Sequence, residues 1–100
     1  MANLFTINKS PFETNGLATA LRFAPAESSI LLLEDGVYAA MRSTRWESML
    51  TQHQDKSFYV LLEDLAARGL SPDELTTTFH PINYAGFVDL AVACDKVQAW

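Results

Sequence analysis

The chain has 100 residues, of which 49% are hydrophobic and 19% charged, and a formal net charge of −5 at pH 7. A chain of this length buries roughly 65% of its unfolded surface, enough for one core, so we expect a single domain over residues 1–100. No run approaches the roughly 18 apolar residues of a membrane span, and no leader-like start is present, so we expect a cytoplasmic protein without membrane contact. The acidic balance argues against direct nucleic-acid binding, which depends on basic surfaces.

The sequence has few of the residues that form metal and disulfide sites, with one cysteine and two histidines. Cys94 is the single cysteine, so an intramolecular disulfide is excluded. His53 and His80 stand apart from each other and from the cysteine, without the spacing of zinc ligands. We therefore expect no metal and no cofactor.

The first third of the chain predicts a strand, a helix and a second strand. A short strand-like run covers residues 4–7. Ser10 to Glu13 form a capping-box pattern with Pro11 at the first helical position, so a helix is expected to begin at Pro11. Helically spaced apolar residues continue it until Pro25, namely Leu17, Ala20, Leu21 and Ala24. The continuous apolar run 30–33 is typical of a strand covered on both faces, as at the centre of a parallel sheet.

The middle of the chain predicts short helices around a third strand. Residues 34–36 end the central strand, and segments 37–41 and 44–50 indicate one broken helix or two short ones. The aromatic and β-branched run 58–62 predicts a strand. The helix that follows is expected to end at Arg68 and Gly69, a basic last turn with a glycine stop.

The last third completes an alternating pattern. A second capping box at Ser71 to Glu74 precedes a weak strand predicted at 76–79, and residues 97–100 indicate an edge strand or an ordered tail. Between them a helix capped by Asn83 is predicted from its apolar spacing, given by Tyr84, Phe87, Val88, Ala91 and Val92. Alternating strands and helices predict an α/β fold, a four- or five-stranded and mainly parallel sheet with helices on both faces.

Polar residues follow several of the predicted strands. Ligand and catalytic groups of a parallel sheet gather at the carboxyl ends of its strands. The candidate functional rim consists of Lys9, Ser10, Glu34, Asp35 and Gly36. The pair Glu63 and Asp64 shares this edge, although helix-dipole complementation explains it, as capping explains Ser10. Glu34 and Asp35 leave one alternative open, a stand-alone homo-oligomeric protein or enzyme that binds a small molecule or Mg²⁺.

Cys94 is expected to be structural rather than catalytic. It lies on the apolar face of the last helix, near that helix's C-terminus and beside Asp95, and all three features oppose a thiolate. No catalytic residue is predicted elsewhere. Three aromatic residues are candidates for a subunit interface, where such side chains are enriched: Tyr38, Trp46 and Trp100.

The chain resembles the DsrH/TusB family of sulfur-relay subunits over nearly its whole length. The resemblance is carried by blocks at 6–11, 31–40, 63–69 and 83–90, and by the terminal sequence 98–100. It implies a DsrE-like α/β fold and a two-two-two heterohexamer with DsrE/DsrF-like or TusD/TusC-like subunits, whose cysteines pass persulfide sulfur. The sequence leaves open whether the isolated chain forms a homodimer.

The resemblance also implies a process. One branch of the family serves 2-thiolation of the wobble uridine of tRNA, and the other serves oxidation of intracellular stored sulfur. Residues 84–86 and the pair Cys94 and Asp95 look nearer the sulfur-oxidation branch. Some members of that branch carry a cysteine in the first helix, where this chain has Ala20. We therefore expect a scaffolding subunit of a sulfurtransferase complex, without enzymatic activity of its own.

Overall fold

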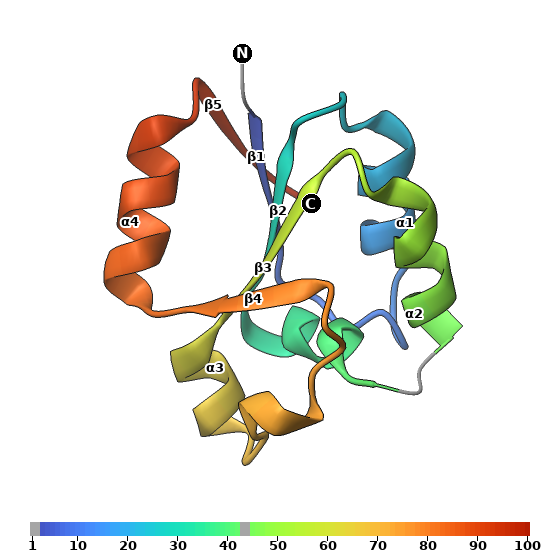
Figure 1. Cartoon of the computed structure of the whole chain (residues 1–100), viewed down its shortest axis with the longest axis vertical. Helices are drawn as coiled ribbons and strands as arrows, with labels where there is room; N and C mark the ends of the chain where they lie inside the picture. Colours follow the sequence, from blue (N-terminus) through green and yellow to red (C-terminus); the bar gives the residue numbers. More distant parts are fainter. Residues whose placement is uncertain (1–2, 43–44) are drawn as a thin grey trace.

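A five-stranded parallel sheet with the order β4-β3-β2-β1-β5 forms the centre of the molecule (Figure 1). The computed structural model describes residues 3–42 and 45–100, and at Arg45 only the backbone. The strands are β1 (Asn3–Ile7), β2 (Ser29–Leu32), β3 (Ser57–Leu61), β4 (Phe79–Ile82) and β5 (Lys96–Ala99). The predicted α/β class and parallel sheet are confirmed, and the C-terminal segment supplies the fifth strand at an edge.

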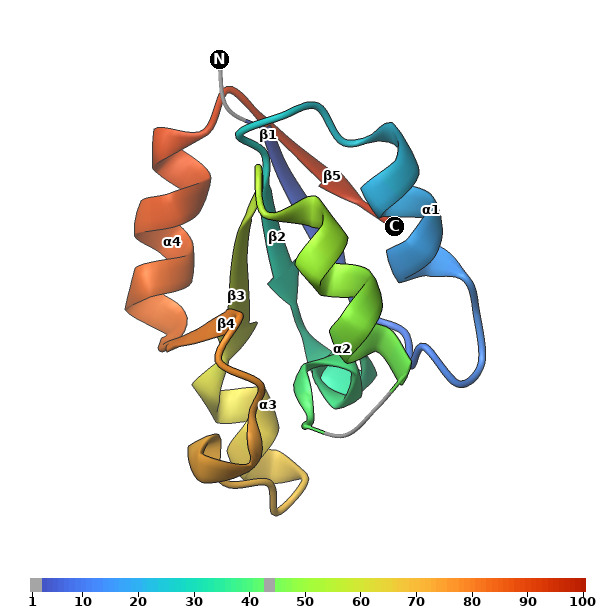
Figure 2. The same ribbon diagram turned by 45° about the vertical axis from the view of Figure 1, so that its right-hand side comes forward.

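Helices cover both faces of this sheet, as predicted. Figures 1 and 2 show α1 (Gly16–Phe23) and α2 (Arg45–Leu50) on one face, α4 (Tyr84–Ala93) on the other, and α3 (Leu62–Ala67) beyond the strand ends. The described residues also form three 3-10 helices: η1 (Glu34–Ala40), η2 (Thr51–His53) and η3 (Pro72–Glu74). Of the two arrangements expected for 37–50, the structure has two separate short helices, η1 and α2.

The sheet has one thick and one thin apolar layer. Side chains alternate between the two faces of a strand. Phe5, Ile30 and Phe58 point to the α1 and α2 side and belong to the main core. Their neighbours Leu4 and Leu31 point to the other face, and both are fully buried there. The α4 face therefore has its own small buried layer, covered by a single helix.

The first helix begins later than predicted. α1 starts at Gly16 and not at Pro11, so the capping box expected at Ser10 is wrong. Ser10 closes a local turn: its Oγ accepts a hydrogen bond from the Phe12 N–H (3.1 Å), and its carbonyl accepts from the Glu13 N–H (3.0 Å). The helix ends where expected, because Ala24 is extended, as the residue before a proline must be.

The fourth strand is also displaced from its predicted position. β4 spans Phe79–Ile82, whereas the prediction was 76–79. Thr76 instead donates its N–H to the carbonyl of Ala40 (2.8 Å), so this segment pairs with the end of η1 and not with β3. Pro81 can lie in β4 because the strand is at the sheet edge, where a missing donor is tolerated.

Three further local predictions are confirmed, whereas the strand predicted over 58–62 ends at Leu61 because Leu62 begins α3. Ser71 and Glu74 form the second capping box, and Asn83 caps α4 by accepting the N–H of Gly86 (2.8 Å). Gly69 follows α3 with a φ of +68°, the left-handed conformation that a glycine stop provides. None of the helices in the described part of the chain has the length and apolar content needed to cross a bilayer.

Candidate functional site

The predicted rim lies at the carboxyl ends of β1 and β2, and its backbone is tightly packed. Gly36 shows how tightly, because a Cβ at this position would lie 2.1 Å from the carbonyl oxygen of Ile7. No other residue fits there. Leu33 ties the same two segments together by donating its N–H to Ile7 (2.9 Å). Gly36 therefore allows the backbone of η1 to pass close to the end of β1.

Residues in and just after α3 bind both acidic residues of the rim. Asp64 accepts the backbone N–H of Glu34 (2.6 Å), and Asp35 forms an ion pair with Arg68, with Nη2 2.9 Å from Oδ1. Glu34 itself is exposed. Asp35 is thus paired with Arg68, although its side chain remains 54% exposed. The interactions fasten η1 to α3.

Glu63 has a similar structural role at the start of α4. Its carboxylate accepts the backbone N–H of Tyr84 (3.0 Å), one of the N–H groups that the first turn of a helix leaves unpaired. Sequence reasoning placed Glu63 at the dipole of its own helix, and the structure shows that it also caps a helix 21 residues further on. No group of three or more His, Cys, Asp or Glu side chains that could hold a metal ion occurs among the described residues.

The other two rim residues, Lys9 and Ser10, follow β1. Ser10 is buried and its hydroxyl is used in the turn described above. Lys9 is exposed beside it. The structure therefore uses the Glu34 backbone, the Asp35 carboxylate, the Ser10 hydroxyl and Gly36 in local contacts at the strand ends, while the side chains of Lys9 and Glu34 are exposed.

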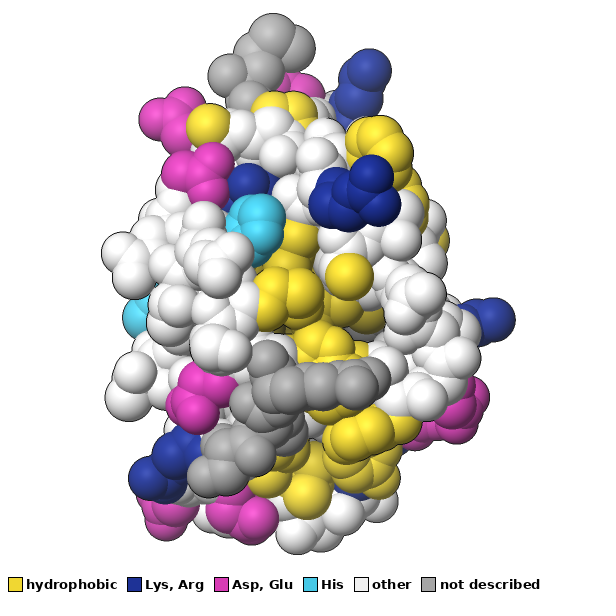
Figure 3. Space-filling view, turned by 90° about the vertical axis from the view of Figure 1, so that its right-hand side faces the viewer, with side chains coloured by type: hydrophobic (Ala, Val, Ile, Leu, Met, Phe, Trp, Pro, Cys, Tyr) yellow, Lys and Arg dark blue, Asp and Glu magenta, His cyan; other side chains and the backbone are white. Residues whose placement is uncertain are grey.

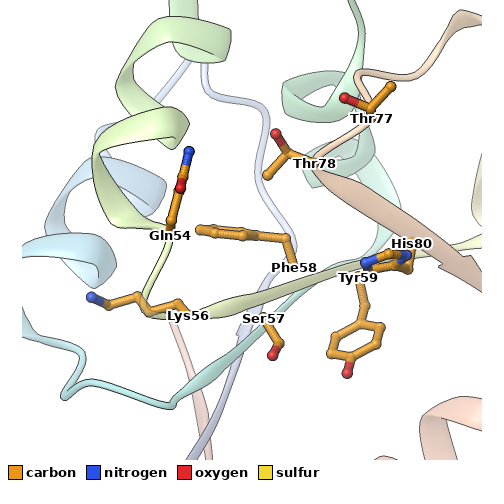
Figure 4. A pocket seen from close by; sticks show the side chains of 8 residues that line it. All are labelled: Gln54, Lys56, Ser57, Phe58, Tyr59, Thr77, Thr78 and His80. Atoms are coloured by element: carbon orange, nitrogen blue, oxygen red, sulfur yellow. The ribbon is translucent and has the colours of Figure 1, made fainter.

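A polar cavity of about 410 Å³ lies at the opposite, amino ends of β3 and β4 (Figure 4). It is lined by Gln54, Lys56, Ser57, Phe58, Tyr59, Thr77, Thr78 and His80. Figure 4 shows Phe58 and Tyr59 pointing to opposite sides of β3, so the cavity straddles the sheet edge. The ammonium of Lys56 is bound by the neighbouring Asp55 (3.1 Å). The side chains that line the cavity therefore do not all point toward a common centre.

Cys94 follows α4 and is half-buried. Burial raises the pKa of its thiol, and the negative charge of Asp95 raises the pKa further. Both causes act in the direction expected from sequence. At neutral pH the thiol is therefore protonated, and a protonated thiol is a poor nucleophile.

The aromatic residues predicted at an interface pack within the chain. Trp46 is only 8% exposed and belongs to the main core, in edge-to-face contact with Phe12 (4.8 Å between ring centres). Trp100 is half-buried and stacks on Phe23 with nearly parallel rings (6.2 Å, 11°). Tyr38 is half-buried in η1. Each tryptophan therefore packs against a phenylalanine that lies further out, Trp46 against Phe12 and Trp100 against Phe23.

Those outer side chains are apolar residues that sequence reasoning did not single out. Phe12 and Phe23 are 67% and 65% exposed, and Figure 3 shows hydrophobic side chains gathered in a band on the face that carries α1 and α2. A second exposed group lies on α4 and β5: Tyr84, Val88, Val92 and Val97. The helical spacing of the α4 residues was visible in the sequence, but the spacing alone gave no sign that Tyr84, Val88 and Val92 point outward.

Comparisons with known proteins agree with this fold. The solved structure of the ychN protein from E. coli superposes with a TM-score of 0.80 at 17% identity, covering 100% of both chains. MTH1491 from Methanobacterium thermoautotrophicum, described as a protein of unknown function, superposes with a TM-score of 0.71 at 13% identity over 97% of both chains. At these identities the likeness concerns the fold.

Sequence comparison gives the family. Protein TusB of Yersinia enterocolitica is 35% identical over 97 residues, covering 97% of this chain and 99% of the relative, and Protein TusB of Yersinia pestis is 36% identical with the same coverage. The family described as DsrH like protein matches residues 9–97. With this match and these relatives spanning nearly its full length, the chain belongs to the DsrH family.

Proposed function

We propose that this chain is a non-catalytic subunit of a hetero-oligomeric sulfur-relay complex. Membership of the DsrH family carries the proposal. The chemistry of the chain supports the word non-catalytic, because the pKa of Cys94 is raised and the rim carboxylate of Asp35 is paired with Arg68. Ala20, at the position where some family members carry a cysteine, is fully buried in α1, so a thiol there would be inaccessible in this fold.

The exposed apolar residues support a role in assembly. They lie on opposite faces of the sheet, with Phe12 and Phe23 on the α1 side and Val88 and Val92 on α4. Contiguous apolar surface on a folded chain commonly marks a protein–protein contact. A subunit inside a closed hetero-oligomer needs contacts with at least two neighbours, and two separate surfaces fit that need. The proposed partners are DsrE/DsrF-like or TusD/TusC-like subunits that carry the transferring cysteines.

Two processes are candidates for this relay. Oxidation of stored sulfur is favoured by the resemblance of residues 84–86 and of Cys94 and Asp95 to that branch. Thiolation of the tRNA wobble uridine is favoured by the relatives named TusB, at 35% and 36% identity. In both processes this chain would hold the partners in place while a partner thiolate attacks the outer sulfur of a donor persulfide, which breaks the donor S–S bond and releases the donor cysteine as a thiolate.

Co-expression with each candidate pair of partners tests the proposal. Size-exclusion chromatography with light scattering should give a stable hetero-oligomer, and labelled persulfide sulfur should pass between partner cysteines equally well with Cys94→Ser. If the chain associates with neither pair, the proposal is wrong. Deleting the gene and measuring 2-thiouridine in tRNA and sulfate formed from stored sulfur then distinguishes the two processes.

The alternative based on Glu34 and Asp35 has its own test. A Mg²⁺-binding protein would show a rise in melting temperature with added Mg²⁺ that Glu34→Gln with Asp35→Asn abolishes. We expect no such rise, because Arg68 already neutralises Asp35.

A further inference from the structure

Helix α4 is apolar on nearly all of its sides. Asp89 is the one charged residue in its ten-residue sequence YAGFVDLAVA. A helix of this kind is normally covered on all sides. None of the ten residues of α4, all of which lie in the described part of the chain, is buried in the single chain. The helix is therefore covered on its sheet side only, and its outer side lacks a cover.

The outer side of α4 carries a regular stripe. Tyr84, Val88 and Val92 are four residues apart, which places them on one line along a helix, and Val92 is 80% exposed. Val97 extends this surface onto the edge strand β5, where it is 50% exposed. It pairs with Leu4, so its side chain lies on the face of the sheet that α4 covers. We call Tyr84, Val88, Val92 and Val97 the α4 surface.

The border of the α4 surface is acidic. Glu63 is bound to the N-terminal N–H of Tyr84, Asp89 lies within the helix and Asp95 follows it. Lys96 is the one cation in the described segment 83–100. A complementary partner would present an apolar centre with basic residues around it, since like charges at such a border oppose association.

A second copy of the chain does not meet this requirement. Two copies of the stripe would pack most evenly as antiparallel helices related by a twofold axis at Val88. Asp89 is the next residue, so the two symmetry-related Asp89 carboxylates would lie on the same side of the contact, close to the axis. Each copy also carries a net charge of −5, and this shared charge adds to the repulsion.

We propose that the α4 surface is the docking site for a cysteine-bearing subunit of the relay, which contributes an apolar patch bordered by lysine or arginine. The proposal rests on the proposed function and adds the surface and the chemistry of its partner. The band around Phe12 and Phe23 then stays available for another contact of the assembly.

Val92→Glu and Asp89→Lys test the docking site in the full chain. Both residues are exposed, so the variants should keep the unfolding midpoint of the wild type. Each should weaken binding to the purified DsrE/DsrF-like or TusD/TusC-like pair by a factor of about ten or more, as measured by calorimetry. Ala66→Glu, another apolar-to-acidic change at an exposed position, on α3, serves as the control and should bind normally.

The outcomes separate the two proposals. If the wild-type chain binds the subunit pair and the Val92→Glu variant binds it with the same affinity, the docking site is overturned. The proposed subunit function would then still stand. A wild-type chain that dimerises alone, and becomes monomeric in Val92→Glu, would assign the surface to a second copy and overturn the partner. If the wild type binds neither subunit pair, the proposed function itself fails, together with this inference.

Discussion

The carboxylate of Asp64 accepts the backbone N–H of Glu34, with 2.6 Å between Oδ2 and the nitrogen. Asp64 lies in the first turn of α3, and Glu34 begins η1, so the bond joins the segments that follow two neighbouring strands. Glu34 has a φ of +47°, in the left-handed region that non-glycine residues rarely adopt. The hydrogen bond that the Glu34 N–H donates to Asp64 holds this unusual turn in place.

Removal of this carboxylate should loosen η1 without unfolding the chain. We expect Asp64→Ala to lower the free energy of unfolding by about 1–2 kcal/mol, the range for a partly exposed hydrogen bond to a charged acceptor. Urea denaturation followed by circular dichroism measures this difference. Glu13→Ala, which removes an exposed carboxylate from the turn before α1, should cost less than about 0.5 kcal/mol. Equal costs for the two variants would mean that the bond to Glu34 contributes nothing.

Gly36 should be the least replaceable glycine among those in the described structure. Gly36→Ala brings a Cβ against the backbone of Ile7, which cannot rotate away as a side chain could, and we expect a loss of about 3 kcal/mol or more. Gly69→Ala meets no atom within 4 Å and is strained only by its φ of +68°, at a cost of about 1 kcal/mol. Thermal unfolding of both variants tests the order. A cost for Gly36→Ala no larger than that for Gly69→Ala would contradict the steric explanation.

Periodicity and capping residues predicted most of the fold. The central strand, the end of α3 at Gly69, the capping box at Ser71 and the cap of α4 at Asn83 all follow from local chemistry, so the sequence was sufficient. The start of α1 was mispredicted because Ser10 has two local options, a helix cap and a short turn, and sequence does not distinguish them.

Long-range pairing explains what the sequence could not reveal. The shift of β4 depends on Thr76 pairing with Ala40, a contact between distant segments. The candidate rim was located at the correct strand ends, but the partner of the Glu34 backbone N–H lies 30 residues away in sequence and the partner of the Asp35 carboxylate 33 residues away. Helical periodicity showed that α4 is apolar, yet only the sheet order shows that one side of it is uncovered.

Trp46 and Phe12 are in contact, but Trp46 belongs to the core and Phe12 to the surface. Trp46→Ala should lower the free energy of unfolding by about 3–5 kcal/mol, because it removes a large buried side chain from the main core. Phe12→Ala should cost about 1 kcal/mol or less, because the ring is 67% exposed and loses mainly one aromatic contact. Chemical denaturation of both variants tests this. If both variants lost a similar free energy of unfolding, Trp46 would not be packed in the core as the structure shows.

The reactivity of Cys94 should depend on pH in a way that burial and Asp95 determine. Both raise the pKa of the thiol, so the reactive thiolate forms only above the ordinary range for cysteine, and alkylation by iodoacetamide at pH 7.5 should be slower than that of a free cysteine peptide. Asp95→Asn removes one of the two causes. The pKa should then fall, and the alkylation rate at the same pH should rise, while desolvation, the larger cause, keeps it below the peptide rate. Alkylation of the wild type as fast as the peptide would show that Cys94 is an accessible thiolate, and a sulfur-carrying role for this chain would have to be reconsidered.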